Sequence, residues 1–190
     1  MTDYSIALFL HIVGALGFFV ALGLEWISLR GLERAATSEQ AREWLGVLGL
    51  LRRIGPASMA MILLAGFYMM ATVWGGVAWI GIALGAMILL AVLAVALSGR
   101  RMAAVGRAAA AESGALSPAF RQRLHDPLLW TSLQTRIAIA LGIVFLMTVK
   151  PELAGSLLTI GLAIILGLVS AWPRWGRSRV KEPAVEGRGA

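Results

Sequence analysis

One histidine and three methionines inside apolar runs of this sequence could bind a metal ion. His11 lies about five residues, or roughly 7–8 Å, inside the first apolar run. An ionisable side chain there is costly and is a functional candidate by default. With the threading given below, Met69, Met70 and Met147 fall in the outer half of the membrane, near the depth of His11. Imidazole and thioether ligands suit monovalent copper, although methionines in a bundle also serve as packing material and a neutral imidazole can simply bond to a neighbouring helix.

Haem is a second cofactor that His11 could bind. Bis-histidine ligation needs a second histidine at a similar depth, but His125, the other histidine, falls in a polar loop most of a membrane thickness away. Haem would therefore need His11 alone, or methionine as the other axial ligand. Copper and haem both stay open at this point.

Glu25 and Arg136 form a second polar set inside the apolar runs. Both fall in the inner part of the membrane, and an ion pair would lower the cost of keeping Arg136 there. We predict a structural ion pair. In the alternative, Arg136 extends to the interface and Glu25 is hydrated. A proton or ion pathway would need further carboxylates within the spans, and the apolar runs contain none.

The elements that position these residues are membrane-spanning helices. Hydrophobic residues make up 59% of the 190 residues, above the 45–50% or so of soluble domains, and about 20 apolar residues cross a bilayer as a helix. The sequence predicts an all-α, polytopic transmembrane helix bundle that forms a single domain over residues 1–172. Its five spans are predicted at about residues 6–29, 56–74, 77–97, 128–149 and 153–172.

Between the first two spans, Thr37 and Gln40 fit a capping box, and leucines at helical spacing follow. This predicts a separate amphipathic helix on the membrane surface, before span 2 begins at Pro56. Residues 173–190 are basic and are predicted to be a disordered cytoplasmic tail.

Basic residues set the predicted orientation. Five lie in each of the first loop, the loop between spans 3 and 4, and the tail, whereas Lys150 alone lies on the opposite side. By the positive-inside rule the N-terminus is outside and the C-terminus is cytoplasmic. We expect a multi-pass protein of a bacterial inner membrane. The strong positive charge is therefore explained by the orientation of the loops in the membrane, and we expect no nucleic-acid partner.

Gly81 and Gly85 in span 3 form a GxxxG pair that would let another helix approach closely. Besides the lipid bilayer, we therefore expect a second copy or another membrane protein as partner. The chain has no cysteine, which excludes disulfides, thiolate metal sites and cysteine nucleophiles.

Two segments, LHIVGALGFFVALGLEW in span 1 and TRIAIALGIVFLMTVKP at the end of span 4, resemble small bacterial membrane proteins related to the copper-resistance D family. The resemblance implies His11 as a metal ligand. The membrane protoporphyrinogen oxidases have a similar first-span histidine and pair it with a lysine in their third span, which span 3 lacks here.

The sequence thus predicts an integral inner-membrane protein without a recognisable catalytic apparatus. Three functions stay open: non-enzymatic packing with partners, copper handling or transport through His11 and the methionines, and haem-linked redox chemistry.

Overall fold

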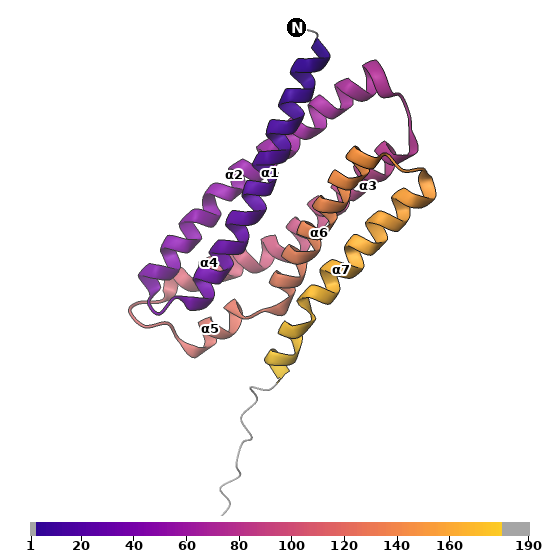
Figure 1. The fold of residues 1–190 in the computed structure, drawn as a ribbon. Coiled ribbons are helices and arrows are strands. Elements are labelled where there is room, and N and C mark those ends of the chain that lie inside the picture. The colour runs from indigo at the N-terminus through magenta and orange to yellow at the C-terminus, as the bar shows by residue number, and fades with distance from the viewer. Residues whose placement is uncertain (1–2, 180–190) are drawn as a thin grey trace, which may run out of the picture.

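The computed structural model describes residues 3–179, which form an all-helical bundle without a strand (Figure 1). Five of its helical segments are long and apolar enough to cross a membrane, which confirms the predicted number of spans. These segments are Asp3–Arg34, Ser38–Trp74, Ala78–Ala111, Pro118–Val149 and Leu153–Pro173. The side of the membrane that each end faces stays a prediction from the charge pattern.

The helical elements follow one another with short connections. In chain order they are α1 Asp3–Arg34, α2 Ser38–Met69, the π-helical turn η1 Met70–Trp74, α3 Ala78–Leu93, the π-helical turn η2 Ala94–Gly99, α4 Arg100–Ala111, α5 Pro118–Leu124, α6 Pro127–Val149 and α7 Leu153–Arg179.

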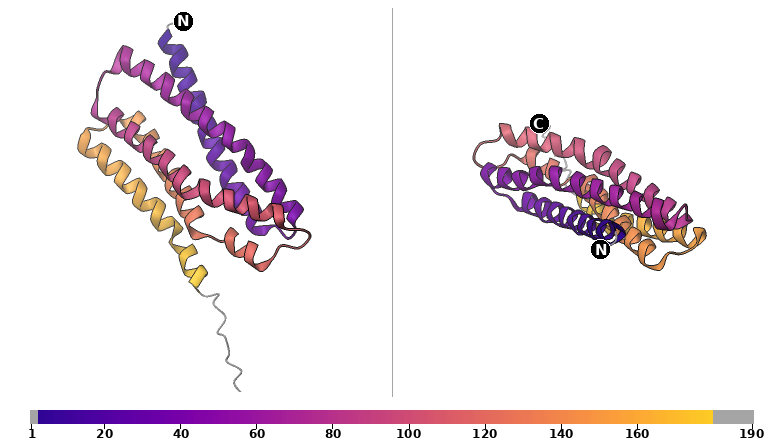
Figure 2. Two further views of the ribbon diagram at one scale, coloured as in Figure 1. Left: turned by 180° about the vertical axis from the view of Figure 1, so that it is seen from behind. Right: turned by 90° about the horizontal axis from the view of Figure 1, so that it is seen from above.

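α1 and α2 form a long antiparallel pair, side by side in both views of Figure 2. Two glycines of α1 permit the close approach, because a Cβ on Gly14 would lie 3.0 Å from the side chain of Ile62 and one on Gly17 would lie 2.5 Å from Ser58 Oγ. The turn into α2 has the hydroxyl half of the predicted capping box, and the Gln40 side chain reaches one residue beyond the N-cap Thr37. The Thr37 hydroxyl accepts from the Gln40 N–H, and the Gln40 side chain accepts from the Ala36 N–H.

The prediction of a separate surface helix before Pro56 is wrong. α2 is one continuous helix from Ser38 to Met69 with Pro56 inside it. Proline lacks the N–H that would bond the carbonyl four residues earlier, at Arg52. Pro56 and Arg52 are both on the exposed side of α2, so packing against α1 holds the helix through this position.

α6 is the most deeply buried helix, and it packs against α7, α3 and α1. α6 and α7 approach each other closely at two glycines, one in each helix. A Cβ on Gly142 of α6 would meet Ala163 at 3.2 Å, and one on Gly167 of α7 would meet the Thr135 Cα at 2.5 Å. α6 is therefore the element through which the other helices are brought together.

α4, α5 and the α1–α2 turn gather at one end of the bundle (Figure 1). Backbone bonds join them, from the Ser38 N–H to the Gly114 carbonyl at 2.9 Å and from the Leu116 N–H to the Ala36 carbonyl at 3.4 Å. Ser117 and Asp126 cap α5 and α6, each followed by a first-turn proline. The alanine run at residues 108–111 forms the last turn of α4.

α7 extends beyond the predicted end of span 5. It continues through Arg179 instead of ending at Trp172, so the first residues of the predicted disordered tail are helical. The prediction for residues 180–190 lies outside the described residues.

The α6–α7 contact yields a test of the packing. Gly167→Ala should destabilise the protein by about 1–3 kcal/mol, because the added methyl group meets the backbone of α6. Gly161→Ala on the same helix is the control, since nothing lies within 4 Å of its Cβ position. Thermal unfolding in mild detergent measures both, and equal midpoints for the two variants would contradict the packing.

Candidate functional site

His11 of α1 makes one contact with α2 and one with α6. Its Nδ1 lies 3.0 Å from the carbonyl oxygen of Ile62, and its Nε2 lies 3.5 Å from Sδ of Met147. Gly66 lies beside the ring, where a Cβ would be 3.4 Å from two ring atoms. The structure therefore holds the imidazole in one orientation between three helices.

The two contacts fix the tautomer of a neutral imidazole. A carbonyl oxygen can only accept, so Nδ1 carries the hydrogen and donates to Ile62, which leaves Nε2 with a lone pair. Sδ of Met147 carries no hydrogen either. Two acceptor atoms therefore face each other across 3.5 Å. Histidines that bind metals usually donate their other ring N–H to a carbonyl or carboxylate in this way.

A cavity of ≈ 40 Å³ adjoins this contact. It lies between α1, α3 and α6, and Met87 of α3 lines it together with His11 and Met147. The sequence analysis missed Met87, because it compared only methionines of the outer half, and Met87 lies ten residues into its helix from the Val77 cap. The cavity is large enough for a water molecule or a metal ion.

Met69 and Met70, the other predicted ligands, lie farther along α2. Met69 is seven residues, or about 10 Å of helix, beyond Ile62. Met69 is buried and Met70 is partly buried, and neither lines the His11 cavity. The structure brings His11 together with Met147 and Met87, and it does not bring Met69 or Met70 to them.

The donor atoms of this site fit a soft ion better than a hard one. Residues 3–179 contain no group of three His, Cys, Asp or Glu side chains that could hold a metal. With the nitrogen and sulfur bond lengths of tetrahedral zinc, about 2.0 and 2.3 Å, two ligand atoms on one ion lie about 3.5 Å apart.

A haem does not fit, since pockets for organic ligands measure at least about 300 Å³ and this one measures ≈ 40 Å³.

The structure places Glu25 and Arg136 in a two-pronged ion pair between α1 and α6. The guanidinium NH1 donates to one carboxylate oxygen at 3.0 Å and NH2 to the other at 2.5 Å. The two side chains are only 17% and 7% exposed. Arg136 therefore turns inward instead of extending to the interface.

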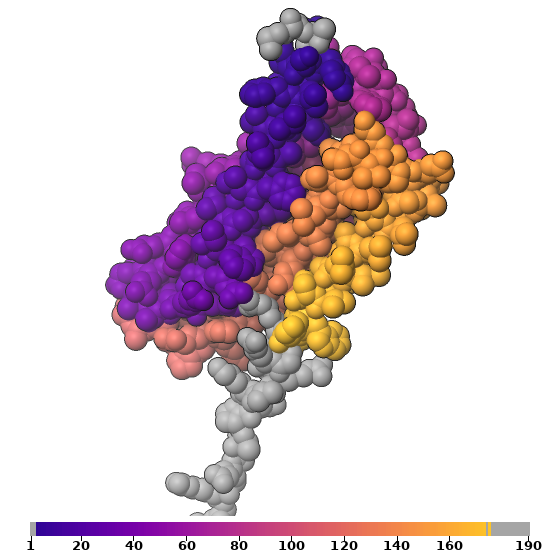
Figure 3. All heavy atoms as spheres, viewed as in Figure 1, coloured from indigo at the N-terminus to yellow at the C-terminus, as the bar shows by residue number. Residues whose placement is uncertain are grey.

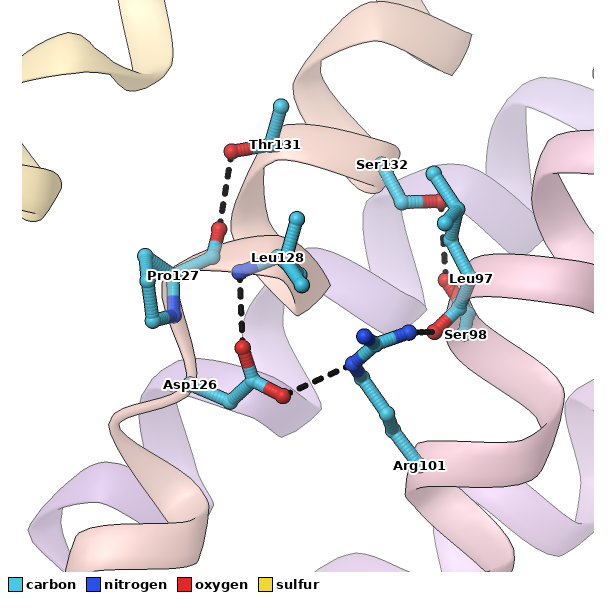
Figure 4. A network of polar contacts seen from close by, with 8 residues as sticks. All are labelled: Leu97, Ser98, Arg101, Asp126, Pro127, Leu128, Thr131 and Ser132. Atoms are coloured by element: carbon cyan, nitrogen blue, oxygen red, sulfur yellow. Dashed lines mark hydrogen bonds and ion pairs between the residues drawn. The ribbon is translucent and has the colours of Figure 1, made fainter.

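Hydroxyl groups extend this ion pair towards α3. Arg136 also donates to Ser98 Oγ at 3.2 Å, Ser98 donates to Ser132 at 3.0 Å, and Ser132 donates to the Leu93 carbonyl. Figure 4 shows these serines near a second ion pair, in which Arg101 Nε bonds Asp126 at 2.8 Å. This outer pair is about 30% exposed, at 31% and 29%.

Gly81 and Gly85 both lie on the exposed face of α3, with nothing within 4 Å of either Cβ position. The GxxxG pair is therefore not used between the helices of one chain.

This fold and these two polar centres define a multi-pass helical membrane protein. It has a buried ion pair towards one end and an imidazole–thioether cavity nearer the other. Comparisons with protein-family models, with curated proteins and with solved structures found no match to the chain.

The buried ion pair yields a prediction on stability. Glu25→Ala should cost about 3–5 kcal/mol, because it leaves Arg136 charged, buried and without its carboxylate. Glu25→Leu combined with Arg136→Leu should recover much of that loss, since no unpaired charge remains.

Arg101→Gln is the matched control, and it should cost no more than about 1 kcal/mol because its pair is partly exposed. Chemical or thermal unfolding in detergent measures all of the variants. An equal loss for Glu25→Ala and Arg101→Gln would show that the inner pair is not specially buried.

Proposed function

We propose that this chain is an integral protein of a bacterial inner membrane that handles monovalent copper, bound by His11, Met87 and Met147. The observation that carries the proposal is the approach of His11 Nε2 to the Met147 thioether at 3.5 Å while Nδ1 is bonded to the Ile62 carbonyl, since a neutral imidazole then turns its Nε2 lone pair to the sulfur. A soft cation in the adjoining cavity would satisfy both atoms.

Copper(I) suits this donor set in charge as well as in softness. All three side chains are neutral with His11 in the tautomer described above, so the bound site carries the charge of the ion alone. A monovalent ion costs less to place in an apolar interior than a divalent one, because solvation energy grows with the square of the charge. Hard divalent ions would also require oxygen ligands, which the cavity lining does not provide.

The sequence supports the proposal independently. The first-span histidine and the FLMTVKP ending, which includes Met147, are the segments that resemble the copper-resistance D family. With the orientation predicted from the basic loops, His11 and Met147 would lie in the outer half of the bundle, where copper from outside the cell would arrive first. Haem is not proposed at His11, because the cavity is too small for it.

Copper binding to the purified protein tests this function. Under reducing, oxygen-free conditions, the protein should take about one copper per chain from a chromophoric Cu(I) chelator. Met87→Leu and Met147→Leu conserve volume and should each weaken binding by about tenfold or more, because each removes a ligand sulfur.

Met69→Leu is the control, since Met69 is a buried methionine that does not line the cavity. It should bind copper as the wild type does. Absence of copper in the wild type, or equal binding by all three methionine variants, would overturn the copper assignment.

An exposed face of α3 supports a second candidate, non-enzymatic packing with a second copy of the chain. Gly81 and Gly85 are open to a partner helix, and Ile88, Val92 and Val95 continue the exposed face at 66%, 53% and 70%. Small residues let helix backbones approach closely within a bilayer, where dispersion contacts drive association.

Leucines at both glycines test this packing. Gly81→Leu combined with Gly85→Leu should lower self-association, measured by crosslinking in lipid vesicles and by the mass of the protein in mild detergent. Gly49→Leu, at another glycine with an open Cβ position, should leave association unchanged. A monomeric wild-type protein, or an unchanged oligomer in the double variant, would exclude this packing.

A further inference from the structure

A groove of ≈ 330 Å³ lies where α1 ends and α2 begins, far from the His11 cavity. It is much larger than that cavity and falls in the size range of sites for small organic molecules. Its walls combine aromatic, basic and amide side chains, and no carboxylate is among its described lining residues. These residues are Trp26, Ile27, Arg30, Gly31, Arg34, Ala35, Gln40 and Trp44.

Gly31 makes the groove possible. A Cβ at Gly31 would lie 2.1 Å from the ring of Trp44, so only a glycine lets this ring lie directly against α1. The Trp44 ring then forms one wall of the groove. Gln40, at the start of α2, uses its side-chain oxygen to accept from the Ala36 N–H, which leaves its amide nitrogen as a donor.

Arg30 brings a positive charge to this groove, and it forms none of the ion pairs found among the described residues. Its guanidinium lies 4.9 Å from the Trp26 ring centroid and 5.4 Å from that of Trp130. These rings hold the cation but offer no hydrogen-bond acceptor in the ring plane. Nε of Arg30 is buried and has no partner among residues 3–179. Arg34 adds a second, exposed guanidinium one turn later.

The groove opens onto the apolar side of α1. Trp26 and Ile27 at its edge are 40% and 48% exposed. One turn towards the middle of the helix, Gly23 is exposed with nothing within 4 Å of its Cβ position, and the exposed Val20 and Leu16 follow at helical spacing. α1 lies on the surface of the bundle along its length (Figure 3). An acyl chain can therefore lie along α1 above a headgroup in the groove.

We propose that this groove binds the phosphate headgroup of an anionic phospholipid, with Arg30 and Arg34 as the phosphate ligands. Guanidinium groups donate in pairs to phosphate oxygens, and such charge-assisted bonds are among the strongest in proteins. Basic pockets between membrane helices, at the level of interfacial tryptophans, suit anionic headgroups. The proposal is independent of copper, because none of its residues lines the His11 cavity.

Lipid retention and thermal stability of the full chain test this site. Delipidated protein in mild detergent is given dioleoylphosphatidylglycerol, dioleoylphosphatidylcholine or inorganic phosphate. Bound lipid is counted by native mass spectrometry and stability is followed by thermal unfolding. We expect the phosphatidylglycerol to be retained and to raise the unfolding midpoint, and the other two additives to have little effect.

Arginine variants identify the residues. Arg30→Gln and Arg34→Gln should each weaken phosphatidylglycerol retention by about tenfold, the effect of losing one charge-assisted bond. Arg107→Gln, an exposed arginine of α4 outside the groove, should retain the lipid as the wild type does. Because Arg34 is exposed, its variant stays informative even if Arg30→Gln does not fold.

Three outcomes would overturn the proposal. Equal retention of phosphatidylcholine would show that the groove does not select charge. Full stabilisation by inorganic phosphate alone would assign the groove to a free anion. Unchanged phosphatidylglycerol retention in Arg34→Gln and in a folded Arg30→Gln would place the lipid elsewhere.

Discussion

The ion pair between Glu25 and Arg136 is the constraint on which the arrangement of this bundle depends. α1 packs mainly with α2, and α6 packs with α7 and α3, so the bundle contains two groups of helices that must be joined. The Glu25–Arg136 ion pair joins α1 to α6 directly, and the bond from Arg136 to Ser98 connects η2 to the same ion pair. Replacing a buried ion pair by apolar residues is often neutral in free energy, whereas leaving one charge alone is strongly unfavourable. The pair therefore selects the register of α1 against α6 more than it adds stability.

The His11 cavity lies along the same contact between α1 and α6. Fourteen residues separate His11 from Glu25, and eleven separate Arg136 from Met147, which are close to four and three turns of helix. Both residues of α1 therefore share one face, as do both residues of α6. A slip of either helix by one residue would rotate Met147 away from His11 and would break the ion pair as well. The geometry of the proposed copper site thus depends on a contact about 16–21 Å of helix away.

Much of the fold could be predicted from the sequence, because the bilayer requires long apolar helices and their number follows from counting them. The start of α2 was harder to predict. Pro56 is a strong local signal for a helix start, but packing along α1 overrides it and keeps α2 continuous. In the candidate site, residue depth placed His11 and Met147 at one level, whereas depth alone cannot show which helices face each other. Met87 was missed because it lies ten residues into α3, below the depth of the methionines that were compared, and only the position of α3 beside α6 brings it to the cavity.

Three polar groups of this bundle show why hydrogen-bond and charge partners matter in an apolar environment, where a missing partner is costly. The charge of Arg136 is compensated within the chain, because a carboxylate from α1 meets two of its nitrogens, while its buried Nε has no hydrogen-bond partner among the described residues. Arg30 lies against two aromatic faces and its Nε has no partner among the described residues, and Nε2 of a neutral His11 faces another acceptor. In water such groups would be hydrated at little cost, but in a membrane protein each lacks a compensating bond. The missing partners differ in kind. The lone pairs of His11 Nε2 and Met147 Sδ attract a soft cation, whereas the Arg30 guanidinium attracts an oxyanion. The ligands proposed for the two ends of α1 are therefore opposite in charge, a metal ion at His11 and a phosphate at Arg30.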